Sequence, residues 1–391
     1  MDTTQETPEE TRLKVLAWLN TTRYASTSLK PLVGGQANFI YHAQLAIPLE
    51  DGMTQVVIKQ GEPYMAKHPT NAITTDRCHV EAECLAELSL MQVHTNEPGI
   101  AKYVVRTPKN LDYHDPTKTQ VQEYLPGMVD LKSYCLEYFS SPTHESLQPQ
   151  CHQIGKALAK YIAHFHDTTK RTLQDPASQN NSGPLLKLDT ILNSSMEMQA
   201  LKHTINYDWL LQRVEQFPEI LAKARNVFEQ VKAMASDEIS SESRELTIIH
   251  GDFCPQNVLV RDAPLEADKE IPLVVVDWEN AQLGVASLDH GEMIGEIYAL
   301  WLYKRIDAAL WILQGYIEGL GLRSESFIWR LAIQVGVHLL SFRTTAPGWG
   351  TPAQIEDVAR KGRDIIINAW RKDRPWFDGN ELTCLFDSTR S

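Results

Sequence analysis

The sequence predicts an α+β fold in which a smaller, β-rich N-terminal part precedes a mainly helical C-terminal part. Residues 31–60 and 103–125 alternate and turn like antiparallel strands, and Gly-containing turns interrupt the first of these stretches. The Pro126-Gly127 pair breaks that pattern, and beyond it most segments have the apolar spacing of helices. We therefore expect three parts: an N-lobe at residues 1–122, a hinge at 123–127 and a helical C-lobe at 128–391.

Helix starts are marked by capping residues at two places along the chain. Thr7, Pro8 and Glu10 form a capping-box pattern with proline at the first helical position, and Thr351 with Gln354 repeats it. The remaining expected helices have apolar residues at helical spacing; they lie near residues 76–93, 153–166 and 207–234, with four more across 288–372.

Composition narrows the classes of function. The chain has 391 residues, enough for two lobes, and its net charge of −13 makes nucleic acid a poor partner, because phosphate backbones favour basic surfaces. No apolar run approaches the ~20 residues that span a bilayer, and the polar, acidic start resembles no targeting segment. The six cysteines form no CxxC pair. We expect a cytoplasmic protein with no membrane partner; the oligomeric state is not predicted.

The stretch HGDFCPQN at residues 250–257 reads as a catalytic loop that leads into a strand. Asp252 is the candidate that orients an acceptor hydroxyl and takes its proton, and Asn257, five residues on, is a candidate metal ligand. The alternative is a tight turn whose aspartate only binds backbone N–H groups. The spacing to Asn257, between apolar residues, favours phosphoryl transfer.

A second acidic motif follows the apolar run VVV at residues 274–276. Asp277 and Glu279 are two residues apart, so on a strand both would face the same side. Two carboxylates on one face repel each other and favour a bound cation, for which Mg²⁺ is the natural candidate. The alternative is a pair of solvated acids at an exposed strand end. Whether Asn257 or Glu279 supplies the second metal ligand stays open.

Gly34 and Gly35, followed by Asn38, lie between two strand-like runs. Glycines let backbone N–H groups approach phosphates closely, so these residues are candidates for nucleotide binding. In isolation, a Gly-Gly hairpin turn explains the same residues.

Lys59 ends the strand-like run VVIK, and the next expected helix carries Glu81 and Glu83. A lysine that binds nucleotide phosphates and is held by a helix glutamate occurs in this order in kinases. The alternative is an ordinary surface lysine after a strand.

The segment EYLPG at residues 123–127 fits a hinge that meets a nucleotide base through backbone groups, or a plain linker between lobes. His166, at the end of an apolar helix, is predicted to be a packed core residue rather than a catalytic one.

Taken in order, the motifs resemble the aminoglycoside phosphotransferase and choline kinase-like family over nearly the whole chain. The segments that carry this resemblance are LVGGQANFIY, VVIK, EYLPG, LAKYIAHFH, HGDFCPQN and VVDWE. The Asp-x-Glu form of the last motif is similar to methylthioribose kinase, and the segments 278–298 and 336–362 are similar to fungal 4-hydroxytryptamine kinase.

The resemblance implies a protein-kinase-like, two-lobed fold that uses ATP and Mg²⁺ to phosphorylate a hydroxyl of a small molecule. By motif, Asp252 is the catalytic base and Asp277 with Glu279 binds the metal. The other implied roles are phosphate binding by Lys59 paired with Glu81 rather than Glu83, adenine binding by the Glu123 carbonyl and the Leu125 amide, and bracing of the catalytic loop by Asp289.

Three classes of function follow, and an active small-molecule kinase is favoured because every expected position is filled. A catalytically inactive ATP-binding protein is the alternative. A protein kinase is disfavoured, since neither DFG nor APE accompanies the loop. For the acceptor we expect an amine-bearing alcohol, a sugar or an aminoglycoside-like compound.

The Pro/Gly-rich break at residues 341–350 lies between two of the distal helices and supplies the candidate acceptor residues. Arg343 is expected to bind a polar group of the acceptor or a phosphate, and Trp349 to pack on the acceptor. Alternatively, Trp349 fills a corner between helices.

Overall fold

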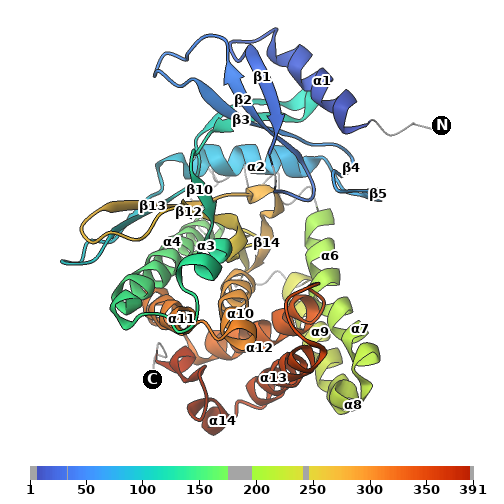
Figure 1. Cartoon of the computed structure of the whole chain (residues 1–391). Coiled ribbons are helices and arrows are strands. Elements are labelled where there is room, and N and C mark those ends of the chain that lie inside the picture. The colour runs from blue at the N-terminus through green and yellow to red at the C-terminus, as the bar shows by residue number, and fades with distance from the viewer. Residues whose placement is uncertain (1–6, 33, 175–195, 241–245, 388–391) are drawn as a thin grey trace. The chain divides into compact units, whose positions relative to one another are not determined.

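The computed structural model describes residues 7–32, 34–174, 196–240 and 246–387. The chain forms two compact units, each of which collects segments from distant parts of the sequence (Figure 1). The first unit comprises the residues up to Met91, Thr107–Pro126 and Trp278–Asn280; the second comprises Gln92–Arg106, Gly127–Asp277 and the residues from Ala281 on.

The first unit is built on a five-stranded antiparallel sheet of order β1-β2-β3-β9-β8. Its strands are β1 (Ser26–Pro31), β2 (Phe39–Leu45), β3 (Gln55–Gln60), β8 (Asn110–His114) and β9 (Thr119–Glu123). Short elements add β4 (Tyr64–Met65), β5 (His68–Ala72) and the 3₁₀ turns η1 (Leu88–Leu90), η2 (Asp115–Thr117) and η8 (Trp278–Asn280).

Two helices accompany this sheet. Helix α1 (Pro8–Leu19) starts at the predicted capping box of Thr7 and Glu10, and its Val15 and Leu19 join the buried core of the sheet. Helix α2 (Asp76–Glu87) buries one face and contacts η8. The first unit therefore has its own hydrophobic core.

The second unit contains a five-stranded mixed sheet of order β10-β12-β13-β7-β6, in which only the β13–β7 pair is parallel. Its strands are β6 (Val93–His94), β7 (Lys102–Arg106), β10 (Met128–Asp130), β12 (Val258–Arg261) and β13 (Glu270–Val275). Strands β11 (Leu246–Ile249) and β14 (Gln282–Val285) pair separately. These strands flank the catalytic loop and lead into the second acidic motif.

Helices make up most of the second unit (Figure 1). They are α3 (Leu131–Tyr138), α4 (Gln148–Gln174), α6 (Glu197–His203), α7 (Trp209–Gln216), α8 (Pro218–Leu221), α9 (Arg225–Ser240), α10 (Ser287–Lys304), α11 (Asp307–Leu320), α12 (Glu325–His338), α13 (Pro352–Trp370) and α14 (Arg374–Asp378). The 3₁₀ turns are η3 (Glu145–Leu147), η6 (Ala222–Ala224), η7 (Pro255–Asn257) and η10 (Thr383–Phe386), and the π-helical segments are η5 (Thr204–Asp208) and η9 (Leu339–Arg343).

Glycine allows α4 and α11 to pack with their backbones in close contact. A Cβ atom on Gly155 would lie 1.9 Å from the Ile312 carbonyl oxygen, and one on Gly315 would lie 1.8 Å from the His152 carbonyl oxygen. Larger residues at either position would force the helices apart. This close contact fixes α4, whose His166 lies beside the catalytic loop.

The predicted α+β fold class, with a β-rich N-terminal part and a mainly helical C-terminal part, is confirmed. The chain passes from the first unit to most of the second unit between Pro126 and Gly127. The earlier segment Gln92–Arg106 also belongs to the second unit, because β7 pairs with the distant strand β13. The role of residues 123–127 as a hinge stays a prediction. Among the described residues, no helix is long and apolar enough to cross a membrane.

Candidate active site

The catalytic loop joins β11 to β12 and is held by a buried aspartate on α10. Asp289 Oδ2 accepts the His250 backbone N–H at 2.7 Å, and Oδ1 accepts the Gly251 backbone N–H at 2.9 Å. His166 Nε2 donates to the same carboxylate at 2.9 Å. Gly251 has φ +81°, a conformation that suits glycine. His166 is therefore a buried structural residue, as predicted.

Asp289 stays ionised despite its burial. Desolvation acts to raise its pKa, but the hydrogen bond and charge of His166 and the backbone N–H of His250 outweigh desolvation and lower the pKa to about 2. The ionised Asp289 carboxylate therefore accepts hydrogen bonds that fix the backbone immediately before Asp252.

Asp252 and Asn257, predicted from their spacing, lie in direct contact. Asn257 Nδ2 donates to Asp252 Oδ2 at 2.8 Å and to the Asp252 carbonyl oxygen at 2.9 Å. The Asp252 backbone N–H donates to His250 Nδ1 at 3.2 Å, and His250 Nε2 donates to the Val276 carbonyl oxygen at 3.0 Å. The Asp252 carboxylate is thus held in one orientation and remains partly exposed.

The second acidic motif differs from the strand pair that the sequence suggested. Strand β13 ends at Val275, Asp277 has φ +69°, and Glu279 lies in the 3₁₀ turn η8. The expectation that Asp277 and Glu279 face the same side of a strand is therefore wrong. The alternative of solvated acids is also wrong for Glu279, whose exposed fraction is 5%.

Asn257 and Asp277 are neighbours within the second unit, because the Val276 backbone N–H donates to the Asn257 carbonyl oxygen at 2.9 Å. Glu279 belongs to the first unit, where it receives a hydrogen bond from Asn38 Nδ2 at 2.5 Å and an ion pair from Arg77 Nε at 3.2 Å. Arg77 carried no signal in the sequence and was not predicted.

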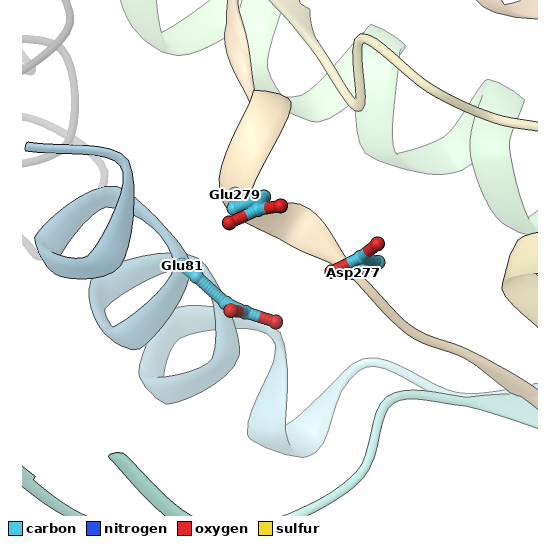
Figure 2. A group of neighbouring side chains, drawn as sticks. All are labelled: Glu81, Asp277 and Glu279. Carbon is cyan, nitrogen blue, oxygen red and sulfur yellow. The ribbon is translucent and has the colours of Figure 1, made fainter. Parts of the chain in front are cut away.

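Carboxylates gather near η8 (Figure 2). Glu81 on α2 and Glu279 offer oxygens within 4.8 Å of each other. Only Trp278 separates Asp277 from Glu279, so the backbone keeps the Cα atoms of these two residues within about 7 Å. Carboxylate oxygens are the ligands that hard cations such as Mg²⁺ prefer, so Asp277 and Glu279, which lie close along the backbone, fit such an ion.

Lys59 and Glu81 form the pair that the sequence predicted. Lys59 Nζ lies 2.8 Å from Glu81 Oε1 and 2.7 Å from Oε2, and both side chains are buried. Glu83 instead approaches His79 at 4.0 Å. The lysine is therefore fixed in one position, as a phosphate-binding group needs to be.

The remaining candidates of the first unit lie at its turns and strand ends. Gly34 and Gly35 have φ angles of +136° and +57°, so both use conformations that favour glycine. Glu123 ends β9, and its backbone N–H donates to the Lys109 carbonyl oxygen at 2.9 Å. Leu125 is half-buried. Nucleotide contacts by these residues stay predictions.

Arg343 and Trp349, the candidate acceptor residues, lie close together in the second unit. In the structure they contact charged side chains of the protein. Arg343 Nε lies 2.9 Å from Glu296 Oε1, and its guanidinium carbon lies 5.6 Å from the centre of the Trp349 ring. Lys132 Nζ lies 4.1 Å from the same ring centre, and the Tyr303 ring packs edge-on against it. Both side chains are half-buried.

A buried polar cluster on α10 was not predicted from the sequence. Lys202 Nζ lies 2.6 Å from Glu292 Oε2, and His338 Nε2 lies 2.6 Å from Glu296 Oε1. Gln256 of the catalytic loop donates to Glu296 Oε2 at 3.0 Å, which links the cluster to Asp252 through the loop. Two glutamates four residues apart in a largely apolar helix were the signal that could have revealed it.

The chain is similar in sequence to a known family and to several characterised proteins. A family model described as the phosphotransferase enzyme family matches residues 48–319, more than half of the chain. Phosphotransferase FrzJ of Cladobotryum sp is 28% identical over 383 residues, which cover 96% of each protein. The 4-hydroxytryptamine kinase of Psilocybe cubensis is 22% identical and covers 92% of this chain and 91% of its own length.

Among solved structures, choline kinase from Cryptosporidium parvum is similar with a TM-score of 0.48 and 11% identity, over 96% of this chain and 99% of that one. The resemblance inferred from the motifs, including that to 4-hydroxytryptamine kinase, is confirmed, whereas the similarity to methylthioribose kinase stays a prediction. The chain belongs to the phosphotransferase enzyme family.

Proposed function

We propose that the protein is an ATP- and Mg²⁺-dependent kinase that transfers the γ-phosphoryl group to a hydroxyl of a small molecule. The observation that carries this proposal is the partly exposed Asp252 carboxylate, oriented by Asn257 in a loop whose backbone is held by Asp289. Similarity to the 4-hydroxytryptamine kinase of Psilocybe cubensis supports a small-molecule acceptor.

Asp252 acts on the acceptor hydroxyl in this proposal. Its carboxylate accepts a hydrogen bond from the hydroxyl, aims the oxygen at the γ-phosphorus and takes the proton as the new O–P bond forms. The bond from the γ-phosphorus to the bridging oxygen breaks, ADP leaves, and the proton then passes to solvent. The Asn257 amide keeps Asp252 oriented throughout.

Asp277 would hold Mg²⁺ together with Asn257 or Glu279, whose oxygens are ligands of the kind that the ion takes. When bound, the ion supplies neutralisation of the charge on the nucleotide phosphates.

The first unit would hold the nucleotide. Lys59, kept in place by Glu81, binds phosphate oxygens, and the turn of Gly34 and Gly35 before Asn38 offers backbone N–H groups. The Glu123 carbonyl and the Leu125 amide would meet adenine.

Lys59→Ala should lower kcat with ATP by roughly 100- to 1,000-fold, the usual loss when one fixed phosphate-binding donor is removed. Glu81→Ala should show a substantial part of this loss, because Lys59 then loses its anchor. Glu83→Ala is the matched control, since Glu83 lies two residues away on the same helix and should have a small effect. Steady-state kinetics of the three variants check the order, and a larger loss in Glu83→Ala would contradict the assignment.

The acceptor would bind beside the catalytic loop in the second unit. Gln256 connects that loop to Glu296, and Glu296 in turn holds Arg343, whose guanidinium approaches Trp349. We propose that Trp349 packs on the acceptor and Arg343 binds one of its polar groups. The classes of acceptor are amine-bearing alcohols, sugars and aminoglycoside-like compounds.

Trp349→Ala should raise the acceptor KM by about tenfold, equivalent to about 1.4 kcal/mol, and leave the ATP KM unchanged. The reason is that Trp349 would contribute equally to ground-state and transition-state binding. Trp349→Phe, which keeps an aromatic ring, should retain most of the affinity. A large fall in thermal stability, or a parallel shift of both constants, would show instead that Trp349 fills a corner between helices.

The six cysteines are all free and buried, which suits a reducing compartment, and we propose that the protein acts in the cytoplasm. The direct test of the function is a panel of hydroxylated amines, sugars and aminoglycosides scored by acceptor-dependent ADP release. Release that requires both an acceptor and Mg²⁺ supports the kinase. ATP binding without turnover on any acceptor would favour the inactive ATP-binding alternative.

A further inference from the structure

Arg77, near the start of α2, is fully buried and binds groups at four separate places in the first unit. Its Nε lies 3.2 Å from Glu279 Oε2, and its Nη2 donates to Asn38 Oδ1 at 2.9 Å. Its Nη1 donates to the carbonyl oxygens of Thr74 at 2.5 Å and Glu62 at 3.2 Å. These bonds occupy every edge of the planar guanidinium, a geometry that lysine cannot reproduce.

Asn38 closes this arrangement into a triangle. Its Nδ2 donates to Glu279 Oε2 at 2.5 Å while its Oδ1 accepts from Arg77. Each of the three side chains therefore contacts the other two, and all three are buried. Asn38 directly precedes β2 and follows the turn of Gly34 and Gly35, so the triangle ties that turn to η8.

We propose that Arg77 is a positioning residue that holds the Gly34–Asn38 turn and the Trp278–Asn280 segment as one piece. The inference rests on the proposed function, in which the turn contacts phosphates and η8 directly follows the metal-binding Asp277. Arg77 lies one helical turn before Glu81, so the same face of α2 that fixes Lys59 also fixes η8.

The triangle also decides the role of Glu279. A buried carboxylate is stable only with a partner, and Arg77 already matches the charge of Glu279 within the first unit. Asn257, by contrast, lies next to Asp277 in the second unit. Asn257 therefore remains a candidate ligand of Mg²⁺ beside Asp277, and Glu279 acts on the nucleotide site indirectly, through Asn38.

Hydrogen exchange of the unliganded protein tests the structural half of this inference. Arg77→Met and Glu279→Gln should each raise exchange at residues 34–41 by about fivefold or more, while the catalytic loop at residues 250–257 is unchanged. Arg77→Lys should give a smaller increase in exchange, because lysine keeps the positive charge but lacks the planar set of guanidinium N–H donors. Asp76→Asn, an exposed neighbour on the same helical turn, is the matched control and should change nothing.

Kinetics test the functional half. Arg77→Lys and Glu279→Gln should raise the ATP KM by about fivefold or more, with the acceptor KM and the half-saturating Mg²⁺ concentration unchanged. The double variant Arg77→Met/Glu279→Gln should lose less than the sum of its single variants, because no buried charge is left unpaired.

Two results would overturn the inference. One is unchanged exchange at residues 34–41 in both Arg77→Lys and Glu279→Gln. The other is a higher half-saturating Mg²⁺ concentration in Glu279→Gln with a normal value in Arg77→Lys, which would make Glu279 a metal ligand. Absence of turnover on every acceptor would contradict the proposed kinase function but not the positioning role of Arg77, because the hydrogen-exchange measurement does not depend on activity.

Discussion

Asp252→Asn is expected to lower kcat by roughly 100- to 10,000-fold, the usual contribution of a positioned general base, and to leave ATP binding nearly intact. Asparagine keeps the shape of the side chain, so the loop held by Asp289 should not move. Its Oδ1 can still accept the hydrogen bond from Asn257 Nδ2, but its amide cannot take the proton of the acceptor hydroxyl. The loss should therefore fall on the chemical step.

Single-turnover kinetics with saturating ATP and acceptor measure this step directly. Asp268→Asn, which changes an exposed carboxylate in the turn between β12 and β13, is the matched control and should behave like the wild type. Residual turnover of Asp252→Asn above a few per cent of the wild-type rate would remove Asp252 from its assigned role.

Asp277→Ala should weaken Mg²⁺-dependent ATP binding by about 100-fold or more, because Asp277 would hold the ion that neutralises the charge on the phosphates, an effect of several kcal/mol. Glu279→Gln should have a smaller effect, since Glu279 is already paired with Arg77. Isothermal titration with ATP in the presence of Mg²⁺ compares the two variants with the wild type.

The same titration in the presence of a chelator is the control for Asp277→Ala. Without metal, the variant and the wild type should bind ATP with equal and weak affinity, because the carboxylate acts only through the ion. Unchanged affinity for Mg²⁺-bound ATP in both Asp277→Ala and Glu279→Gln would show that the metal is held elsewhere.

Local patterns were sufficient to predict the parts of the fold and site that depend on short stretches of chain. The capping boxes at Thr7 and Thr351 start helices as expected. The five-residue spacing brings Asn257 onto Asp252, and the strand-to-helix order brings Lys59 onto Glu81. The caps and the Asp252–Asn257 contact depend on backbone geometry over only a few residues. For Lys59, the sequence left only two candidate partners on the next helix, Glu81 and Glu83.

Long-range packing decided what the sequence could not show. Glu279 could not be placed correctly, because β13 ends at Val275 and the backbone then turns at Asp277. Its partner Arg77 is about 200 residues away along the chain and matches no motif. The parallel pairing of β7 with β13, which places Gln92–Arg106 in the second unit, is equally non-local.

The polar cluster on α10 could be predicted only in part from the sequence. Glu292 and Glu296 in a largely apolar helix indicate buried carboxylates that need partners. Their partners Lys202 and His338 come from other helices, and nothing in the sequence pairs them. Burial, aided by the charge of Asp252 and opposed by Lys202, raises the pKa of Glu292 to about 8.

Asp252 is proposed to direct transfer of the γ-phosphoryl group of ATP to a small-molecule hydroxyl. Phosphorus-31 NMR of the reaction with the best acceptor of the screen tests it most directly. With wild-type protein, the γ-phosphate signal of ATP should be replaced by a phosphate monoester on an acceptor hydroxyl, and Asp252→Asn should give no such signal over the same time. Inorganic phosphate as the product, or an ester that forms equally with Asp252→Asn, would show that Asp252 does not direct this transfer.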